Sequence, residues 1–361
     1  MRRITVFLLL LASLPAFAQF SLSEGWFAMP SSVQATALPA QLLSKDTAPG
    51  EYSGIAHIGG NRYALVHNGA RGGGIYLADL VLDGEGRLVS SHVAPAPGTE
   101  EAADVRDPEG IAYVPETGTL WVAGERDQQI LEYDLDGRPT GRAMAVPEDF
   151  LPPALSTGNG FESLSYASGT GLMWTVTEEP LRCDADIFPV GEGRRLLRLL
   201  AFDPATLQPA AQRFYAMDAP HQVPMDGDTY VHGVSELLAL DDGTLLVLER
   251  EVWVPAYRAG DRQGMLQTVA QAVTHHKFYL VEPGPDPEVL LSKVLVCSFD
   301  TRFPDAVSLL LGADPGLANF EGMCLGPEIG GHAGVLLVND SERGRGNQYA
   351  RLQDYVKLLV F

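Results

Sequence analysis

Positive charge is scarce in this sequence. Its 361 residues include 25 Lys and Arg against 46 Asp and Glu, which gives a formal net charge of −21. Nucleic acids and anionic lipids are bound through positive patches, so this composition argues against both as partners. An acidic surface attracts cations instead, and it also serves ordinary solubility.

Long apolar runs are missing after the first residues, where no segment approaches the roughly 20 apolar residues of a membrane span. The chain begins with Met1-Arg2-Arg3, an apolar run over residues 4–14 and Ala16-Phe17-Ala18. This order of basic, apolar and small residues is typical of a secretory signal peptide. We expect residues 1–18 to be removed and 19–361 to form one exported domain, periplasmic or secreted and monomeric.

Motifs for common reaction types are also absent. The three cysteines, Cys183, Cys297 and Cys324, have no zinc-site spacing, although two of them could pair in an exported protein. A Gly-x-Ser-x-Gly motif is missing, which disfavours a serine esterase. The glycines of residues 69–74 lack the strand–loop–helix setting of a phosphate-binding loop.

A short phrase recurs five times, and an acid opens four of the copies. Each copy opens an apolar run, which a turn and a second apolar run follow, and such repeats predict repeated structural units. The copies are Ser53-Gly54-Ile55-Ala56, Glu109-Gly110-Ile111-Ala112, Glu162-Ser163-Leu164-Ser165, Glu236-Leu237-Leu238-Ala239 and Glu321-Gly322-Met323-Cys324.

Each complete unit offers four candidate strands, which in the second unit are residues 111–114, 120–124, 129–134 and 142–146. Four antiparallel strands repeated around an axis predict an all-β fold, a β-propeller with five or six four-stranded blades. Residues 355–361 form a last strand, and we expect one strand from residues 34–43 to complete the final blade, because an open ring leaves exposed edges. The predicted long insertions, between or within blades, are residues 180–194, 221–231, 257–275 and 301–318. The last of them precedes the strands of the fifth unit.

The acids are placed to converge. In a hairpin the start of the first strand lies beside the end of the second, and Glu109 and Glu125 are spaced symmetrically about the turn at 115–118. The equivalent pairs are Glu162–Glu178, Glu236–Glu249, Glu321–Asp340 and the neutral Ser53–His67. If these hairpins are the inner strands, all eight acids reach one mouth of the central channel.

Oxygen ligands of this kind favour Ca²⁺ over zinc or copper, with Mg²⁺ a weaker candidate. A structural interpretation stands beside this one. The acids could accept backbone N–H bonds from the next blade and hold the ring together, with nearby arginines neutralising the remainder.

Several of these phrases resemble one known family. Asn319-Phe320-Glu321-Gly322-Met323, Gly160-Phe161-Glu162-Ser163-Leu164 and Gly233-Val234-Ser235-Glu236-Leu237 are similar to motifs of the phytase-like family, described as esterase-like activity of phytase. The resemblance covers roughly residues 50 to 361 and implies an exported propeller that hydrolyses phosphoric esters with calcium. By position it implies metal ligation by Glu109, Glu162, Glu178, Glu236, Glu249, Glu321 and Asp340, whereas the first repeat has His67-Asn68 in place of an acid.

Three functions remain open at this stage. In a Ca²⁺-dependent phosphoesterase, the metal would bridge a small anionic or ester substrate to the protein, Arg126, Arg182 or Arg250 would bind phosphate, and His232 would donate a proton. A propeller that only binds a ligand or a protein is the second possibility. The third is a lactonase-like ester hydrolase, with Glu109, Glu162 and either Asn159 or Asn319 as metal ligands.

Overall fold

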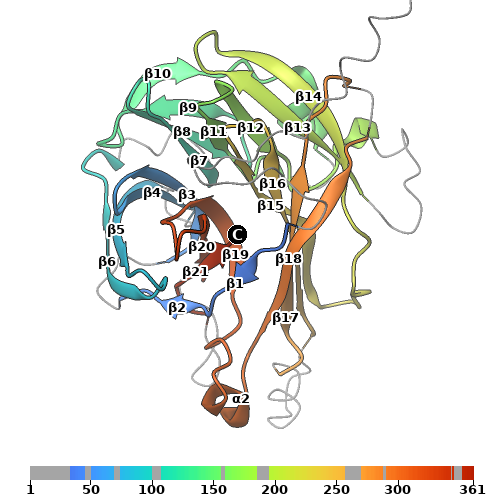
Figure 1. Ribbon diagram of the computed structural model, residues 1–361. Coiled ribbons are helices and arrows are strands. Elements are labelled where there is room, and N and C mark those ends of the chain that lie inside the picture. Colours follow the sequence, from blue (N-terminus) through green and yellow to red (C-terminus); the bar gives the residue numbers. More distant parts are fainter. Residues whose placement is uncertain are drawn as a thin grey trace, which may run out of the picture.

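The computed structural model describes residues 33–44, 50–68, 74–99, 107–155, 159–184, 195–256, 270–287, 290–342, 344 and 352–361. These residues form five antiparallel sheets arranged in a ring (Figure 1). The prediction of an all-β propeller is confirmed, and the number of blades is five. The expected signal peptide, residues 1–18, lies outside the described residues.

Each of the first four blades is built from four consecutive strands. Blade 1 contains β3 (Tyr52–Gly59), β4 (Arg62–His67), β5 (Gly74–Leu82) and β6 (Leu88–Pro95). Blade 2 contains β7 (Pro108–Val114), β8 (Thr119–Gly124), β9 (Ile130–Tyr133) and β10 (Pro139–Ala143). Blade 3 contains β11 (Ser165–Ala167), β12 (Leu172–Val176), β13 (Leu196–Asp203) and β14 (Gln208–Ala216). Blade 4 contains β15 (Thr229–Ala239), β16 (Leu245–Val254), β17 (Val273–Val281) and β18 (Lys293–Arg302).

Blade 5 joins the two ends of the chain. Its strands β19 (Asn319–Leu325), β20 (Gly334–Asp340) and β21 (Tyr355–Val360) are completed by β1 (Thr36–Ala37) from the N-terminal part. The pairing of β1 with β21 is antiparallel, and the short β2 (Gln41–Leu42) pairs with the other end of β21. The blue and red strands therefore lie together in Figure 1, and the predicted closing strand is confirmed.

The core lies between the blades. Five clusters of buried apolar side chains each join two neighbouring blades, so every blade is covered on both faces. In β16, for example, Leu246 packs against blade 5 while Leu245 and Val247 pack against blade 3. Burial on both faces explains why the strands appear in the sequence as continuous apolar runs rather than as alternating patterns.

The structure corrects several predicted boundaries. The strand expected at 142–146 is β10 at Pro139–Ala143. Parts of the predicted insertions 221–231 and 257–275 belong to β15 and β17, because the strands of blade 4 extend beyond those of the other blades. The three cysteines are unpaired.

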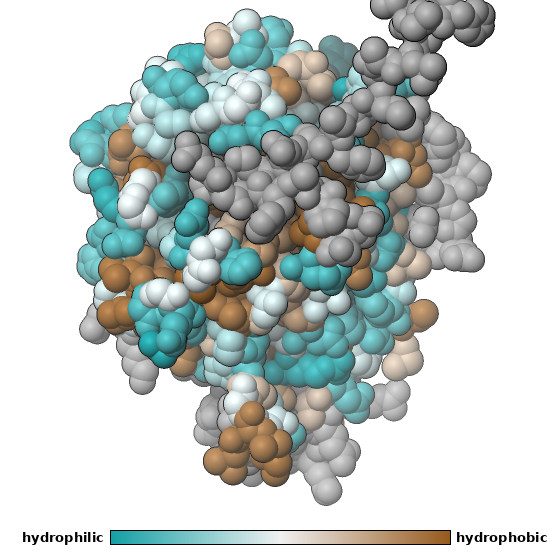
Figure 2. All heavy atoms as spheres, viewed as in Figure 1, coloured by the Kyte–Doolittle hydropathy of each residue, from teal (hydrophilic) through white to brown (hydrophobic). Residues whose placement is uncertain are grey.

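The insertion at 301–318 contains the helix α2 (Ala306–Leu310), which forms the brown tip at the bottom of Figure 2, where Val307, Leu310 and Leu311 are exposed. Short 3-10 turns lie at Glu148–Phe150 and Pro152–Ala154 between blades 2 and 3, and at Arg182–Asp184 between β12 and β13 of blade 3. In the described part of the chain, no helix is long and apolar enough to cross a membrane.

Neighbouring blades approach closely where a glycine follows the first residue of the repeated phrase. A Cβ atom on Gly110 would lie 2.4 Å from the carbonyl carbon of Ser163, and one on Gly54 would lie 2.4 Å from the carbonyl oxygen of Glu109. Real Cβ atoms do not approach backbone atoms so closely. These glycines therefore allow the first strands of the blades to pack around the axis.

We expect Gly110→Ala to destabilise the protein by about 2 kcal/mol, because the added methyl group forces two blades apart. Thermal melting followed by circular dichroism measures the effect as a drop of a few degrees. Gly84→Ala is the control, since Gly84 lies in an exposed turn where an added methyl group would meet no other atom. Equal melting temperatures for the two variants would contradict the close-approach argument.

Candidate functional site

The inner hairpins share one irregularity. In blades 1, 2, 4 and 5 the register between the first two strands shifts by one residue near the same end, as in a β-bulge. In blade 3, Phe161 pairs with Thr177 and Ser165 pairs with Trp174. Over this stretch the first segment therefore has one residue more than the second. The positions within the bulge are Ser53, Glu109, Glu162, Ser235 and Glu321.

Six predicted acids gather at this end of the axis, and we call them the ring carboxylates. Oxygen atoms of Glu125, Glu162 and Glu178 lie within 4.8 Å of one another, as do those of Asp107, Glu109 and Glu125. Glu321 interacts electrostatically with Glu109 and Asp340. The ring carboxylates are Glu109, Glu125, Glu162, Glu178, Glu321 and Asp340.

Blade 4 departs from the predicted pattern by one residue on each strand. Gly233 pairs with Arg250, as Gly160 pairs with Glu178 in blade 3. Ser235 and Arg250 therefore occupy the positions that carry ring carboxylates in other blades. The predicted ligands Glu236 and Glu249 are the sequence neighbours of Ser235 and Arg250. Their side chains point in other directions, because neighbouring residues on a strand face opposite sides of the sheet.

Glu236 lies one layer below the ring, at the level of Gly110 and Gly322. Its carboxyl group accepts hydrogen bonds from the backbone N–H groups of Leu237 at 3.0 Å and Met323 at 3.5 Å. Burial raises its pKa well above the ordinary range, and these bonds only partly oppose the shift. Because Met323 belongs to blade 5, Glu236 matches the structural interpretation, in which an acid holds neighbouring blades together.

Glu249 faces blade 3, away from the ring. Its carboxylate accepts hydrogen bonds from the Tyr215 hydroxyl at 2.6 Å and the Asp218 backbone N–H at 3.0 Å, and it forms an ion pair with Lys293. Asp218 pairs in turn with Lys277 and Lys293. Glu249 therefore belongs to a satisfied polar network between two blades.

Arg250 is the buried cation among the ring carboxylates. Its guanidinium forms ion pairs with Glu178 of blade 3 and Glu321 of blade 5, and it also donates to the Asn319 side chain at 3.1 Å. Burial alone would lower the pKa of Arg250, but the two carboxylates outweigh burial and raise it. Both terminal nitrogen atoms of the Arg250 guanidinium, which the sequence predicts to bind phosphate, therefore already have carboxylate partners, whereas its Nε atom has no hydrogen-bond partner in the described part of the chain.

Asparagine side chains satisfy three ring carboxylates. Asn68 donates to Glu109 at 3.0 Å, Asn159 to Glu178 at 2.6 Å and Asn319 to Glu321 at 2.7 Å. The sequence predicts two of these asparagines only as possible lactonase ligands. The asparagines lie beside the acids because of how the strands pair, and this pairing cannot be predicted from the repeated phrase alone.

Glu162 and Glu125 differ from the other ring carboxylates. In the described part of the chain, no hydrogen-bond donor meets either carboxyl group, although Glu162 is only 6% exposed. Burial and the neighbouring Glu178 and Glu109 raise the pKa of Glu162 well above its ordinary range. Burial, followed by the charges of Glu178 and Asp107, raises the pKa of Glu125 to about 7.

The remaining predicted residues lie at the edge of this group or apart from it. Arg126 pairs with Asp107 at 2.6 Å and keeps a side chain that is 72% exposed. Arg182 is exposed in the 3-10 turn at Arg182–Asp184. His232 is buried beside Glu251, and burial lowers its pKa to about 4, so its imidazole is neutral at pH 7.

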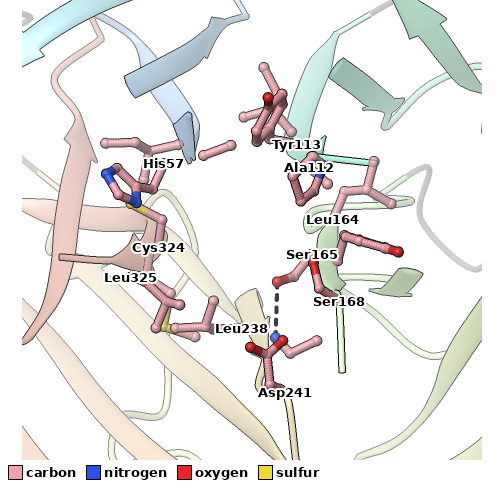
Figure 3. Close-up of a pocket in the computed structure, with 17 residues that line it drawn as sticks. His57, Ala112, Tyr113, Leu164, Ser165, Ser168, Leu238, Asp241, Cys324 and Leu325 are labelled. Carbon is pink, nitrogen blue, oxygen red and sulfur yellow. Dashed lines mark hydrogen bonds between the residues drawn. The ribbon is translucent and has the colours of Figure 1, made fainter. Parts of the chain in front are cut away.

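The opposite end of the channel has a different character. Figure 3 shows a cavity lined by the far ends of the first strands, including Ala112, Leu164, Leu238 and Cys324. Its volume is about 180 Å³. Its lining includes His57 and Asp241 but none of the ring carboxylates. One end of the axis is therefore an opening with both polar and apolar lining residues, and the other end is the acidic cluster.

Comparison with known proteins finds one family. Residues 47–342 match the family described as "Phytase-like: Esterase-like activity of phytase", which confirms the resemblance of the motifs. No curated protein matches the chain.

Solved structures of similar shape include two α-L-arabinofuranosidases. That of Coprinopsis cinerea (GH62 catalytic domain) has 10% identity and a TM-score of 0.46, covering 92% of this chain and 98% of its own. That of Podospora anserina, in complex with cellotriose, has 8% identity and a TM-score of 0.43, with the same coverage of 92% and 98%. Likeness at this level carries no information on the chemistry of this chain.

The raised pKa values predict how stability depends on pH in the presence of chelator. In an unfolded chain these carboxyl groups titrate near pH 4.3, whereas the folded values for Glu125 and Glu321 are about 7. Between pH 7 and 8 the folded protein therefore binds more protons than the unfolded chain, and stability falls as pH rises. Buried histidines such as His232 have lowered pKa values, and their titration makes stability rise with pH. This opposite effect operates only below about pH 6.5.

We expect the melting temperature in chelator to fall from pH 7 to pH 8, and Glu162→Gln to reduce the slope. Differential scanning calorimetry of both proteins measures this. A melting temperature that is constant or rises over this interval would show that the carboxyl groups are ionised already.

Replacement of Arg250 tests its role as the buried counter-charge. Arg250→Met leaves Glu178 and Glu321 without a cation, and we expect a loss of about 3–5 kcal/mol in the free energy of unfolding. Arg126→Met removes an exposed ion pair and is expected to change stability by less than about 1 kcal/mol. Chemical unfolding of the two variants gives the comparison, and similar losses for both would argue against a special role for Arg250.

Proposed function

Because this chain belongs to the phytase-like family, we propose that it is an exported hydrolase of phosphoric esters that works with Ca²⁺ bound to the ring carboxylates. The apolar run and small residues within 1–18 support export. The proposal rests above all on one observation at the axis. Two carboxyl groups, those of the buried Glu162 and the half-buried Glu125, have no protein donor among the described residues and lie together with Glu178.

A cation is the group that fits this arrangement. Six carboxylates surround one buried guanidinium, so ionisation of all of them leaves a large negative excess that only protons or cations can offset. Carboxylate oxygens without imidazole or thiolate are the ligands preferred by Ca²⁺. Oxygens within 4.8 Å of one another can share one ion, because Ca²⁺–oxygen distances are about 2.3–2.6 Å.

Glu125, Glu162 and Glu178 are the residues we assign to this ion. Asp107, Glu109 and Glu125 form a second group of similar spacing, but in it only Glu125 is without a donor, because Arg126 pairs with Asp107 and Asn68 donates to Glu109. The smaller Mg²⁺ ion fits less well, since it requires a more regular octahedral arrangement.

Ca²⁺ held there would bind phosphate oxygens, lower the pKa of a water molecule and offset developing negative charge. Arg250 keeps Glu178 and Glu321 in place rather than binding substrate. Arg126, exposed at the edge of the group, is the arginine free to reach a phosphate by changing its partner.

The proposal predicts that Ca²⁺ binds and that hydrolysis requires it. We expect turnover of phosphomonoesters or phosphodiesters with Ca²⁺, no turnover after chelation, and a rise in melting temperature on adding Ca²⁺. Glu162→Gln should weaken Ca²⁺ binding by about tenfold or more, because a charged ligand is lost. Calorimetric titration and a hydrolysis screen that also includes lactones provide the measurements.

Glu249→Gln is the matched control. It makes the same change at a buried acid that the structure places outside the ring, so Ca²⁺ affinity and turnover should remain. Activity that survives both chelation and Glu162→Gln would reject the metal site. Ca²⁺ binding without turnover of any ester would make the protein a binding propeller, and turnover of lactones alone would favour the lactonase-like alternative.

A further inference from the structure

Blade 4 carries a row of four polar residues, one from each strand. His232 of β15 pairs with Glu251 of β16, Glu251 pairs with His275 of β17, and His275 pairs with Asp300 of β18. Directly paired residues of neighbouring strands lie on the same face of a sheet. The row therefore places two imidazoles and two carboxylates side by side on one face.

A third imidazole covers this row. His221, in the connection from blade 3, places its Nδ1 atom 2.9 Å from a carboxylate oxygen of Glu251. Its ring lies against that of His275, with the ring centres 4.4 Å apart. A ring nitrogen of His221, one of His275 and an oxygen of Glu251 all lie within 4.8 Å of one another.

Two nitrogen atoms of this cluster have no hydrogen-bond partner in the described part of the chain. These are Nε2 of His275 and Nδ1 of His232, and both are inaccessible to solvent. His232 as a whole is only 4% exposed. Buried polar atoms without a partner are uncommon in native proteins, and each one requires an explanation.

The other nitrogen of His275 is already oriented. Its Nδ1 atom lies 2.6 Å from a carboxylate oxygen of Asp300. A histidine that binds a metal through one nitrogen usually donates the other N–H to a carboxylate or carbonyl. The pair Asp300–His275 therefore has the arrangement of a metal ligand and its orienting partner.

Glu251 has a structural role that does not account for these histidines. It accepts hydrogen bonds from the backbone N–H groups of His221 and Gln222, at 2.8 and 2.7 Å, and from the Tyr230 hydroxyl at 3.1 Å. These bonds hold the 218–222 segment on blade 4. They leave the Nε2 atom of His275 and the Nδ1 atom of His232 without partners.

We propose that His221, Glu251 and His275 form a second metal site, which binds a divalent transition-metal ion such as Zn²⁺, and that Asp300 positions His275. Two imidazoles and one carboxylate are a common ligand set for zinc and related ions, with a further position left open. The cavity between His221, His232, Glu251 and His275 has a volume of about 10 Å³, room for a single ion, and its lining is completed by Ala219, Glu249, Arg250 and Lys277.

This site is separate from the ring carboxylates. Arg250 and Glu251 are adjacent on β16, where neighbouring side chains point in opposite directions: Arg250 reaches Glu178 and Glu321 at the axis, whereas Glu251 contacts the 218–222 segment. The donor atoms differ as well, because imidazole nitrogen favours transition metals and carboxylate oxygen alone favours Ca²⁺. The proposal does not depend on the function proposed for the ring.

Calorimetric titration with Zn²⁺, in a large excess of Ca²⁺, tests the site on the full chain after treatment with chelator. We expect one equivalent of Zn²⁺ to bind, and Co²⁺ in its place to give visible absorption bands. His221→Gln should weaken binding by well over tenfold, and Asp300→Asn by about 10- to 100-fold, because it removes the group that orients His275. Glu162→Gln should leave Zn²⁺ binding unchanged.

His92→Gln, at an exposed histidine on β6, is the matched control and should bind Zn²⁺ as the unaltered chain does. His221 is 42% exposed, so its replacement is compatible with folding, which a melting curve verifies. Failure of Zn²⁺ and Co²⁺ to bind in saturable fashion would overturn the proposal. So would equal affinities for the unaltered chain, His221→Gln and Asp300→Asn.

Discussion

The one-residue shift of register in each inner hairpin is the constraint on which the axial site depends. Without it, the alternation of a strand would send every second side chain into the apolar contacts between blades. The extra residue turns Glu109, Glu162 and Glu321 toward the axis, as a bulge commonly does near functional sites. The glycines that follow Glu109 and Glu321 then allow neighbouring backbones to meet, which closes the ring beneath the acids.

Burial makes ionisation of the ring carboxylates unfavourable, and hydrogen bonds and ion pairs within the protein offset only part of this cost. Asparagine side chains and Arg250 satisfy Glu109, Glu178 and Glu321, while Glu125 and Glu162 have no donor among the described residues. The ring therefore contains a rigid, satisfied part and an unsatisfied part side by side. An ion bound beside Glu125 and Glu162 would also meet Glu178, whose carboxylate Arg250 and Asn159 already hold in position, so that ligand requires little ordering on binding.

Blade 4 differs from the others in ways that concern both proposed sites. Its strands are longer, and at the ring position it carries a cation, Arg250, where three other blades carry an acid. The next residue, Glu251, lies on the opposite face with the histidines. A single strand thus contributes to a group of oxygen ligands on one face and to a mixed nitrogen and oxygen group on the other, and the sheet between them keeps the two apart.

The sequence by itself determined the propeller, the closing strand and most of the acidic ring. Apolar runs separated by turns specify hairpins, and the equal spacing of Glu109–Glu125 and Glu162–Glu178 about their turns places both acids of each pair at one end. Tertiary structure alone decided the contribution of blade 4. Glu236 and Glu249 are spaced about their turn as plausibly as the true pair Ser235 and Arg250, and a shift of one residue reverses the direction of a side chain. The alignment of His232, Glu251, His275 and Asp300 likewise arises only when strands distant in sequence are paired, because pairing register is a property of the folded sheet.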